Sequence, residues 1–173
     1  MKLIKCPVTL IDVCPVPDIE LGRFVFVAGG ITNCPDWQGY ITEQFKDQPG
    51  LFLIDPRRDN FDASDPLMSD KQIEWEFYHL HNSDAIMFWF PEETLCPITL
   101  YELGVWAGMG FQRNRHNRKQ IFVGCHPNYK RRFDVIKQLS MLRPEVIVRD
   151  SLEDLISDVR KFINVFVEVY NLK

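Results

Sequence analysis

Apolar residues follow two alternating patterns along the chain. Short unbroken apolar runs bounded by polar, glycine or proline residues are typical of buried strands. Between them lie longer segments in which apolar residues recur every three or four positions, as on one face of an amphipathic helix. Strands are predicted at residues 23–28, 51–54, 85–90, 121–125 and 146–148, and helices at residues 36–46, 69–82, 99–110, 133–141 and 152–166.

The alternation of strands and helices predicts an α/β fold. Successive βαβ units should build a single doubly wound, Rossmann-like parallel sheet of five strands with helices on both faces. No Asn-Gly or Asp-Gly turn joins two alternating runs, so hairpin architectures are not favoured. Residues 23–173 are predicted to form this domain. Residues 1–22, with a plausible strand at 8–13, are interpreted as an N-terminal extension packed on it.

The predicted helix at residues 69–82 has a polar strip beside its apolar stripe. Ser69-x-x-Gln72 has the form of a capping box, which places the helix start at the serine. At about 100° per residue, Gln72 and Glu76 share the polar strip, while Glu74 points to solvent. Glu76 is therefore the better candidate for a partly buried functional acid. The alternative is a simple boundary charge hydrogen-bonded to Gln72. The apolar stripe consists of Ile73, Phe77 and Leu80. His79 is the third member of the polar strip.

Composition narrows the class of protein without changing the predicted fold. The 173 residues carry a net charge of −4 and no long basic stripe, which argues against a nucleic-acid polymer as partner. No apolar run approaches the roughly 20 residues that a membrane span needs. Five scattered cysteines without a C-x-x-C pair indicate free thiols in a reducing, cytoplasmic setting. The chain also lacks the common dinucleotide and triphosphate motifs. His79 and His81 are spaced i, i+2, so on a helix they point to different faces, unlike a metal-binding pair. We therefore expect no cofactor and no metal.

In an open parallel sheet, ligands bind beyond the carboxyl ends of the strands. The loops expected there carry glycines, arginines, carboxylates and aromatic residues, which suit a small, polar, ring-bearing ligand. Gly29-Gly30 either lets the backbone approach a ligand closely or simply makes a tight strand exit. Arg57 and Arg58 either bind a substrate oxygen or hold together an acid-rich loop. These loops are residues 29–37, 55–66, 91–97 and 126–132.

Glu102 has two compatible interpretations. Thr99-x-x-Glu102 matches a capping box, so the glutamate could simply close the start of a helix. The positive end of a helix also keeps a carboxylate ionised, as a nucleophile in glycosyl transfer must be. Glu102 is therefore a candidate nucleophile at the edge where a ligand is expected.

Several segments together resemble the nucleoside 2-deoxyribosyltransferase family. They are closest to a branch with a P-R-R loop and a Q-x-x-W-E helix. The resemblance covers roughly residues 23–148, and its most specific part is PITLYELG. The segments are FVFVAGGI, DPRRDNFD, QIEWEF, SDAIMFWFPEETLCPITLYELG and IFVGCHP.

This resemblance implies a fold, a reaction and a set of site residues. The fold would be flavodoxin-like, and the assembly a homo-oligomer, often a hexamer built from dimers, in which a neighbour completes each site. Glu102 would attack the anomeric carbon and Glu76 would contact the nucleobase. Gly29, Gly30 and Ile31 would border the sugar. No cofactor is implied, and the partners would be nucleosides and free nucleobases.

The chain departs from the family pattern at two positions. The better-known members have an aspartate six residues before the nucleophile, which holds the sugar hydroxyls; here Cys96 stands there, and Glu92 or Glu93 could substitute. Phe133-Asp134-Val135 stands where this branch tends to carry G-N-V.

Trp37 and Trp89 are candidates for stacking on the base, although core packing explains Trp89 nearly as well. The further residues expected at the substrate are Arg57, Gln72, Thr99 and Asp134.

The predicted activity is transfer of a 2-deoxyribosyl group between nucleobases by a retaining double displacement through Glu102. Two alternatives stay open. One is an N-glycoside hydrolase of nucleosides or deoxynucleoside 5′-monophosphates, in which Arg57 or Arg58 binds the phosphate. The other is a non-catalytic nucleoside or nucleotide sensor, in which Glu102 is only a helix cap.

Overall fold

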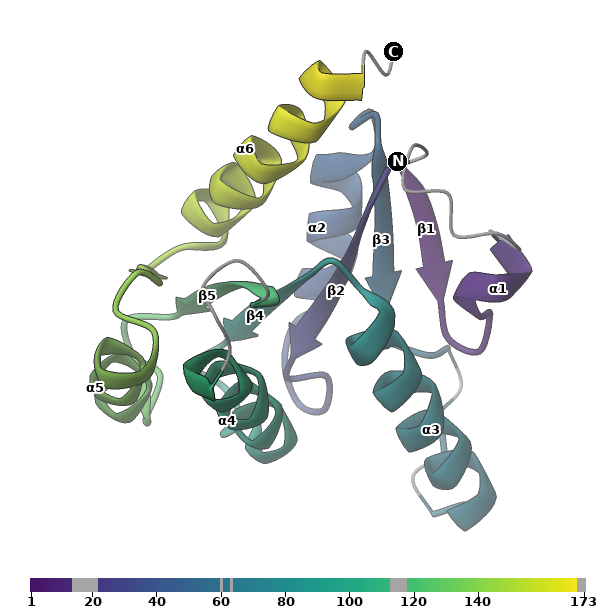
Figure 1. The fold of residues 1–173 in the computed structure, drawn as a ribbon. Coiled ribbons are helices and arrows are strands. Elements are labelled where there is room, and N and C mark those ends of the chain that lie inside the picture. Colours follow the sequence, from purple (N-terminus) through teal and green to yellow (C-terminus); the bar gives the residue numbers. More distant parts are fainter. Residues whose placement is uncertain (14–21, 60, 63, 113–117, 171–173) are drawn as a thin grey trace. The chain divides into compact units, whose positions relative to one another are not determined.

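The computed structural model describes residues 1–13, 22–59, 61–62, 64–112 and 118–170. Within them, parallel strands are flanked by helices, so the protein is α/β as predicted (Figure 1). Six strands are described rather than the five predicted, because residues 2–5 also form one. Contacts divide the chain into two compact units, each of which contains three of the strands.

The first unit comprises residues 1–27, 37–84 and 161–173, as far as they are described. Its strands run parallel in the order β1-β3-β2. Leu53 pairs with Leu3 on one side and with Val25 on the other, which makes β3 the central strand of the three. All five residues of β3 are buried, as its apolar run predicts. The elements are β1 (Lys2–Lys5), α1 (Leu10–Val13), β2 (Arg23–Gly29), α2 (Trp37–Phe45), β3 (Leu51–Asp55) and α3 (Pro66–Asn82).

The second unit comprises residues 28–36 and 85–160, and includes the last two residues of β2. Its strands run parallel in the order β4-β5-β6, and β4 pairs with β5 along its whole length. Every residue of β4 is buried, so this predicted strand is confirmed. Helices α4 and α5 lie side by side (Figure 1). The elements are β4 (Ala85–Phe90), α4 (Pro97–Gln112), β5 (Gln120–Cys125), α5 (Arg132–Leu142), β6 (Val148–Arg149) and α6 (Leu152–Tyr170), whose later turns belong to the first unit.

The strand predicted at residues 8–13 is wrong, because this segment forms a turn and the short helix α1. Thr9 and Asp12 cap that helix reciprocally. The Thr9 hydroxyl and backbone N–H donate to Asp12 Oδ2 at 2.6 and 2.8 Å, and the Asp12 N–H donates back to Thr9 Oγ1 at 3.3 Å. The local cap thus stabilises a helical turn where a strand was predicted.

Helix α3 begins earlier than its predicted capping box. Asp65 is the N-cap and accepts the backbone N–H of Leu67 at 2.9 Å, and Pro66 occupies the first helical position. Ser69 therefore lies within the helix and does not cap it. Proline is favoured at the first position because its fixed φ suits a helix and its missing N–H is not needed there.

The face that α3 buries also differs from the predicted one. Ile73 and Phe77 are 65% and 63% exposed, so the apolar stripe assigned to the core was wrong at both positions. Hydrogen bonds from residues 6–10 supply partners for polar side chains on the buried face, which removes the cost of burying them. The residues that α3 buries are Gln72, Trp75, His79 and Leu80.

His79 is a fully buried histidine with a fixed tautomer. Its Nε2 accepts the backbone N–H of Leu10 at 3.0 Å, and its Nδ1 lies 2.7 Å from the carbonyl oxygen of Trp75, to which it donates. Burial lowers the pKa of the ring, against a smaller opposing effect of the Trp75 hydrogen bond. The imidazole is therefore held neutral in the folded protein.

We expect His79 to make the protein acid-sensitive. A folded-state pKa below the unfolded value of about 6.5 means that the unfolded state binds the extra proton first, so stability present above about pH 6.5 is lost as the pH falls. Urea unfolding at about pH 7.5 and pH 5 measures this loss. His79→Gln retains an acceptor for Leu10 without titrating, and should lose less stability; equal losses in both proteins would contradict the assignment.

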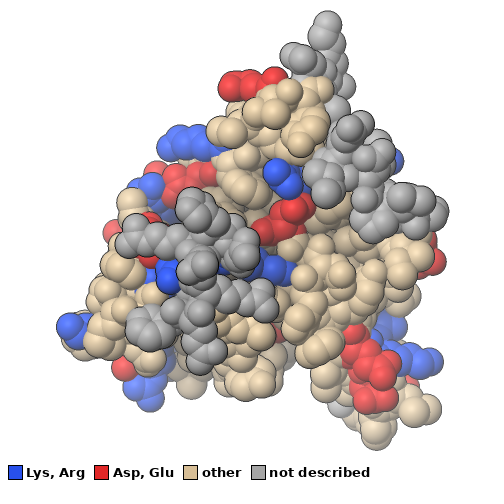
Figure 2. Space-filling model, viewed as in Figure 1, with Lys and Arg blue, Asp and Glu red and all other residues tan. Residues whose placement is uncertain are grey.

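Acidic and basic side chains are interspersed on the face shown in Figure 2. Within the described part of the chain, no helix combines the length and the apolar character needed to cross a membrane.

Candidate active site

Loops that follow β4 and β5 in the second unit are bound to each other. Asn128 Nδ2 donates to Glu92 Oε2 at 2.9 Å, and the Tyr129 hydroxyl donates to the carbonyl oxygen of Leu95 at 2.8 Å. His126 Nδ1 lies 3.6 Å from the same Glu92 carboxylate. These contacts brace the chain between β4 and α4 beyond the carboxyl ends of the strands, where the topology predicts a ligand.

Gly30, just after β2, is in close contact with the loop after β4. A Cβ atom at this position would lie 2.5 Å from Thr94 Cγ2 and 2.8 Å from Cys96 Sγ. The Cys34 thiol donates to the Gly30 carbonyl oxygen at 2.9 Å. The absence of a side chain at Gly30 therefore permits contact between two loops, a packing role that neither sequence-based alternative included. Gly29 and Ile31, beside it, are both partly exposed.

Gly30→Ala is expected to destabilise the protein by about 1–3 kcal/mol, because the added methyl group must displace Thr94 and Cys96. Urea unfolding measures the loss. Gly104→Ala is the matched control, since a Cβ there meets nothing within 4 Å and alanine favours the helix; its stability should be unchanged or higher by up to about 1 kcal/mol. Equal stability of Gly30→Ala and the wild type would contradict the close contact.

Helix α4 begins two residues before its predicted start, so the predicted capping box is wrong. The Leu100 N–H donates to the carbonyl oxygen of Cys96 at 2.9 Å, which makes Cys96 the N-cap and Pro97 the first helical residue. Thr99 is the third helical residue and is buried. As in α3, a proline defines the first turn.

Glu102 consequently lies in the second turn of α4 and is half-buried. A side chain this far into the helix does not close the helix start, and the favourable effect of the helix dipole weakens beyond the first turn. The first-turn position predicted for Glu102 by the capping box is therefore wrong.

Cys96 turns its thiol into the protein. Its φ of 47° is in the left-handed region, and its Sγ lies 3.5 Å from the carbonyl oxygen of Thr94, to which it donates. Burial raises the pKa of this thiol to about 12, so it stays neutral at physiological pH and is not an activated nucleophile. A buried neutral thiol also does not replace the charged hydrogen-bonding group that an aspartate would offer to sugar hydroxyls.

In the first unit, Glu76 is paired with Gln72 on the buried side of α3. Gln72 Nε2 donates to Glu76 Oε1 at 2.8 Å. Burial raises the pKa of Glu76, and the Gln72 hydrogen bond opposes part of that rise. Glu74 is exposed, as predicted. A carboxyl group that holds its proton more firmly than an ordinary glutamate is suited to general acid catalysis.

Arg57 is bound to α2 through a buried glutamine. Its Nε and Nη2 donate to Gln38 Oε1 at 3.1 and 2.9 Å, and its backbone N–H donates to Asp55 Oδ1 at 2.9 Å. These contacts connect the loop after β3 to α2. These contacts favour a structural role for Arg57 over substrate binding.

Both tryptophans proposed to stack on a base are buried. Trp37 is 4% exposed and Trp89 is 5% exposed. Trp89 packs on Gly124, where a Cβ would lie 2.8 Å from the indole ring. Core packing therefore accounts for Trp89.

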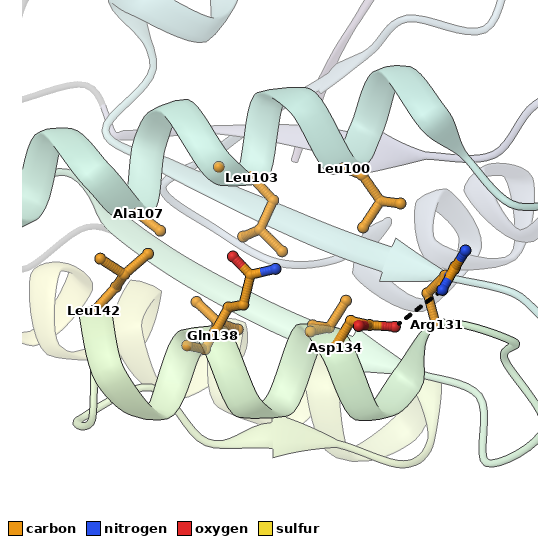
Figure 3. A pocket seen from close by; sticks show the side chains of 10 residues that line it. Leu100, Leu103, Ala107, Arg131, Asp134, Gln138 and Leu142 are labelled. Carbon is orange, nitrogen blue, oxygen red and sulfur yellow. Dashed lines mark ion pairs between the residues drawn. The ribbon is translucent and has the colours of Figure 1, made fainter.

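Asp134 lies at a cavity of about 290 Å³ between α4 and α5 (Figure 3). It forms an ion pair with Arg131, with 3.6 Å between Oδ2 and Nη1. Glu102 is not among the residues that line this cavity. The lining residues are Leu100, Leu103, Gly104, Ala107, Arg131, Asp134, Val135, Gln138, Leu139 and Leu142.

Sequence reasoning missed the two residues that brace the loop before α4. Asn128 and Tyr129 lie in residues 126–132, which were expected at the carboxyl ends of the strands, but a loop position does not reveal which side chains point across to another loop. Their bonds to Glu92 and Leu95 show that Glu92, one candidate to replace the missing aspartate, is already held by neighbours.

The two histidines of α3 have separate surroundings, as their spacing predicts. His79 is buried, whereas His81 is exposed and bonded to the carbonyl oxygen of Phe77 at 2.7 Å. Among the residues that the structure describes, no group of three or more His, Cys, Asp and Glu side chains is arranged to hold a metal ion.

A family model described as "Nucleoside 2-deoxyribosyltransferase like" matches residues 22–129, which is more than half of the chain. The chain belongs to this family. The nucleoside 2-deoxyribosyltransferase-like segment contains Glu76, Glu102 and the Gly30 contact. It ends at Tyr129, so Asp134 lies outside it. No curated protein matches the chain.

Proposed function

We propose that this protein transfers a 2-deoxyribosyl group between nucleobases, with Glu102 as the nucleophile and Glu76 as the acid that faces the base. The observation that carries the proposal is the position of Glu102. In a family-matched segment, a half-buried carboxylate stands in the second turn of α4, beyond the first-turn position that the capping box predicted. Its helix begins at a loop braced beyond the ends of β4 and β5.

The first half of the reaction forms a covalent intermediate. A carboxylate oxygen of Glu102 attacks C1′ of the deoxynucleoside as the C1′–N bond breaks, and the electron pair of that bond goes to the base. Glu76, or a water molecule, gives a proton to the ring nitrogen of the departing base. The raised pKa of Glu76 supports the role of proton donor.

The second half reverses these events with a new base. A ring nitrogen of the incoming base attacks C1′, the bond to Glu102 breaks, and its electron pair returns to the carboxylate. Glu76 takes up the proton that the incoming base loses. Two inversions at C1′ retain the original configuration. Attack by water in place of the base gives hydrolysis.

The proposal includes a homo-oligomer in which a neighbour completes the site. Exposed apolar side chains support it, because water is an unfavourable environment for them. On α3 they include Ile73 and Phe77, and on α4 Ile98 and Tyr101, each more than 60% exposed. Sedimentation velocity tests this part, and a monomer at all concentrations would contradict it.

Mass spectrometry of the intact protein mixed with a 2′-deoxynucleoside tests the mechanism directly. We expect a deoxyribosyl adduct that maps to the peptide containing Glu102 and disappears when a second base is added. Release of base without exchange would indicate the hydrolase. Ligand binding with neither adduct nor base release would overturn the proposal in favour of a sensor.

A further inference from the structure

All the polar atoms of the Gln72 side chain have partners within the first unit. Nε2 donates to the carbonyl oxygen of Pro56 at 2.9 Å and to Glu76 Oε1 at 2.8 Å, and Oε1 accepts the Cys6 thiol at 3.1 Å. Gln72 is 9% exposed. Its two N–H groups are therefore both used inside the protein, so its amide has no N–H left to donate to a substrate.

The surroundings also fix which way the amide points. Burial raises the pKa of the Cys6 thiol to about 11, so at neutral pH it remains an S–H group that donates to Gln72 Oε1. A flipped amide would set its oxygen against the Pro56 carbonyl and the Glu76 carboxyl, two acceptors. Gln72 thus always presents an N–H to Glu76.

The Gln72 N–H that always donates to Oε1 gives the two carboxyl oxygens of Glu76 different surroundings. Because Oε1 accepts from Gln72, a proton on the carboxyl group belongs on Oε2. We propose that Gln72 is a positioning residue that orients the Glu76 carboxyl and reserves Oε2 for proton exchange with the base. This inference rests on the proposed role of Glu76.

The N-terminal segment keeps α3 in place for this purpose. In addition to the Cys6 bond to Gln72, Trp75 Nε1 donates to the carbonyl oxygen of Val8 at 2.7 Å. The Leu10 N–H donates to His79 at 3.0 Å. Three successive inward positions of α3 are thereby bound to residues 6–10, which fixes the rotation of the helix and the direction of Glu76.

The test is Gln72→Met, which retains the length of the side chain and removes its hydrogen bonds. The pKa of Glu76 should rise, because the lost hydrogen bond lowers it in the wild type. The limb of the kcat–pH profile that reports protonation of Glu76 should therefore move to higher pH. Because the carboxyl group is no longer oriented by Gln72, kcat at neutral pH should also fall about tenfold. A folded Gln72→Met protein with an unchanged pH profile would overturn the proposal.

Gln48→Met is the matched control. Gln48 is a buried glutamine of the same unit, whose Nε2 donates to Asn164 Oδ1 at 2.9 Å and which has no bond to Glu76 among the contacts described. It should lose stability without any shift of the pH profile. A similar shift in this variant would mean that general destabilisation moves the limb, and would also overturn the proposal.

An NMR titration of Glu76 without substrate separates this inference from the proposed function. With glutamate side chains labelled and Glu76→Gln used for assignment, Glu76 should titrate at higher pH in Gln72→Met than in the wild type. If the protein catalyses no base exchange but this shift occurs, the proposed function fails and the positioning contact stands. Should Gln72→Met not fold, Cys6→Ala, which removes the thiol that orients the amide, should give a smaller shift in the same direction; no shift would contradict the proposal.

Discussion

Glu102→Gln is expected to lower the rate of base exchange between deoxyinosine and adenine by about 10⁴-fold or more. Glutamine has nearly the shape of glutamate, so the fold should persist, but a neutral amide does not attack C1′. Chromatography of the released and incorporated bases measures the rate. The deoxyribosyl adduct should disappear in the same variant.

An exposed glutamate provides the control for this result. Glu168→Gln on α6 makes the same change of charge at an exposed residue outside the family-matched segment, and should exchange bases at the wild-type rate. If Glu102→Gln retained wild-type exchange, another residue would have to be the nucleophile.

Glu76→Gln should lower base exchange by about 10²-fold or more, because it removes the proposed proton donor. It should also raise stability at neutral pH. Since the pKa of Glu76 is raised in the folded protein, the favourable contribution of its neutral form exists below about pH 4.5 and is lost as the pH rises through the folded value. A permanently neutral glutamine avoids that loss and can still accept from Gln72.

Thermal unfolding across the pH range measures the stability effect. The melting temperature of Glu76→Gln should exceed that of the wild type near pH 7, and the difference should shrink towards about pH 4. Glu74→Gln, an exposed change on the same helix, should alter neither stability nor rate appreciably. A Glu76→Gln protein less stable than the wild type at neutral pH would show that Glu76 is not a destabilised buried carboxyl.

Helix starts were the least predictable local feature. Ser69–Gln72 and Thr99–Glu102 both have the form of capping boxes, yet Pro66 and Pro97 begin these helices earlier. A capping box is a short and common pattern, and a nearby proline with its fixed φ competes for the same start. The reciprocal cap formed by Thr9 and Asp12 lies in a segment that was predicted as a strand.

The buried face of α3 illustrates a second limit. The helix and its end at Asn82 were predicted, but its burial was assigned to Ile73 and Phe77 rather than to the face of Gln72 and His79. Periodicity shows that a helix has distinct faces. It does not show that residues 6–10, more than sixty positions away, supply hydrogen bonds that make a polar face the buried one.

The sequence by itself determined the α/β class, the alternation of elements, the family and the two candidate carboxyl groups. These features depend on local periodicity and on motifs of neighbouring residues. The start of α4 at Pro97, which places Glu102 in the second turn, and the Gln72–Glu76 hydrogen bond involve neighbouring residues. Only the tertiary structure decided that Gly30 is needed for contact between loops and that residues 6–10 hold Gln72 on the buried side of α3. Both contacts bring groups that are distant along the chain within a few ångströms, where burial and hydrogen bonding set the energy.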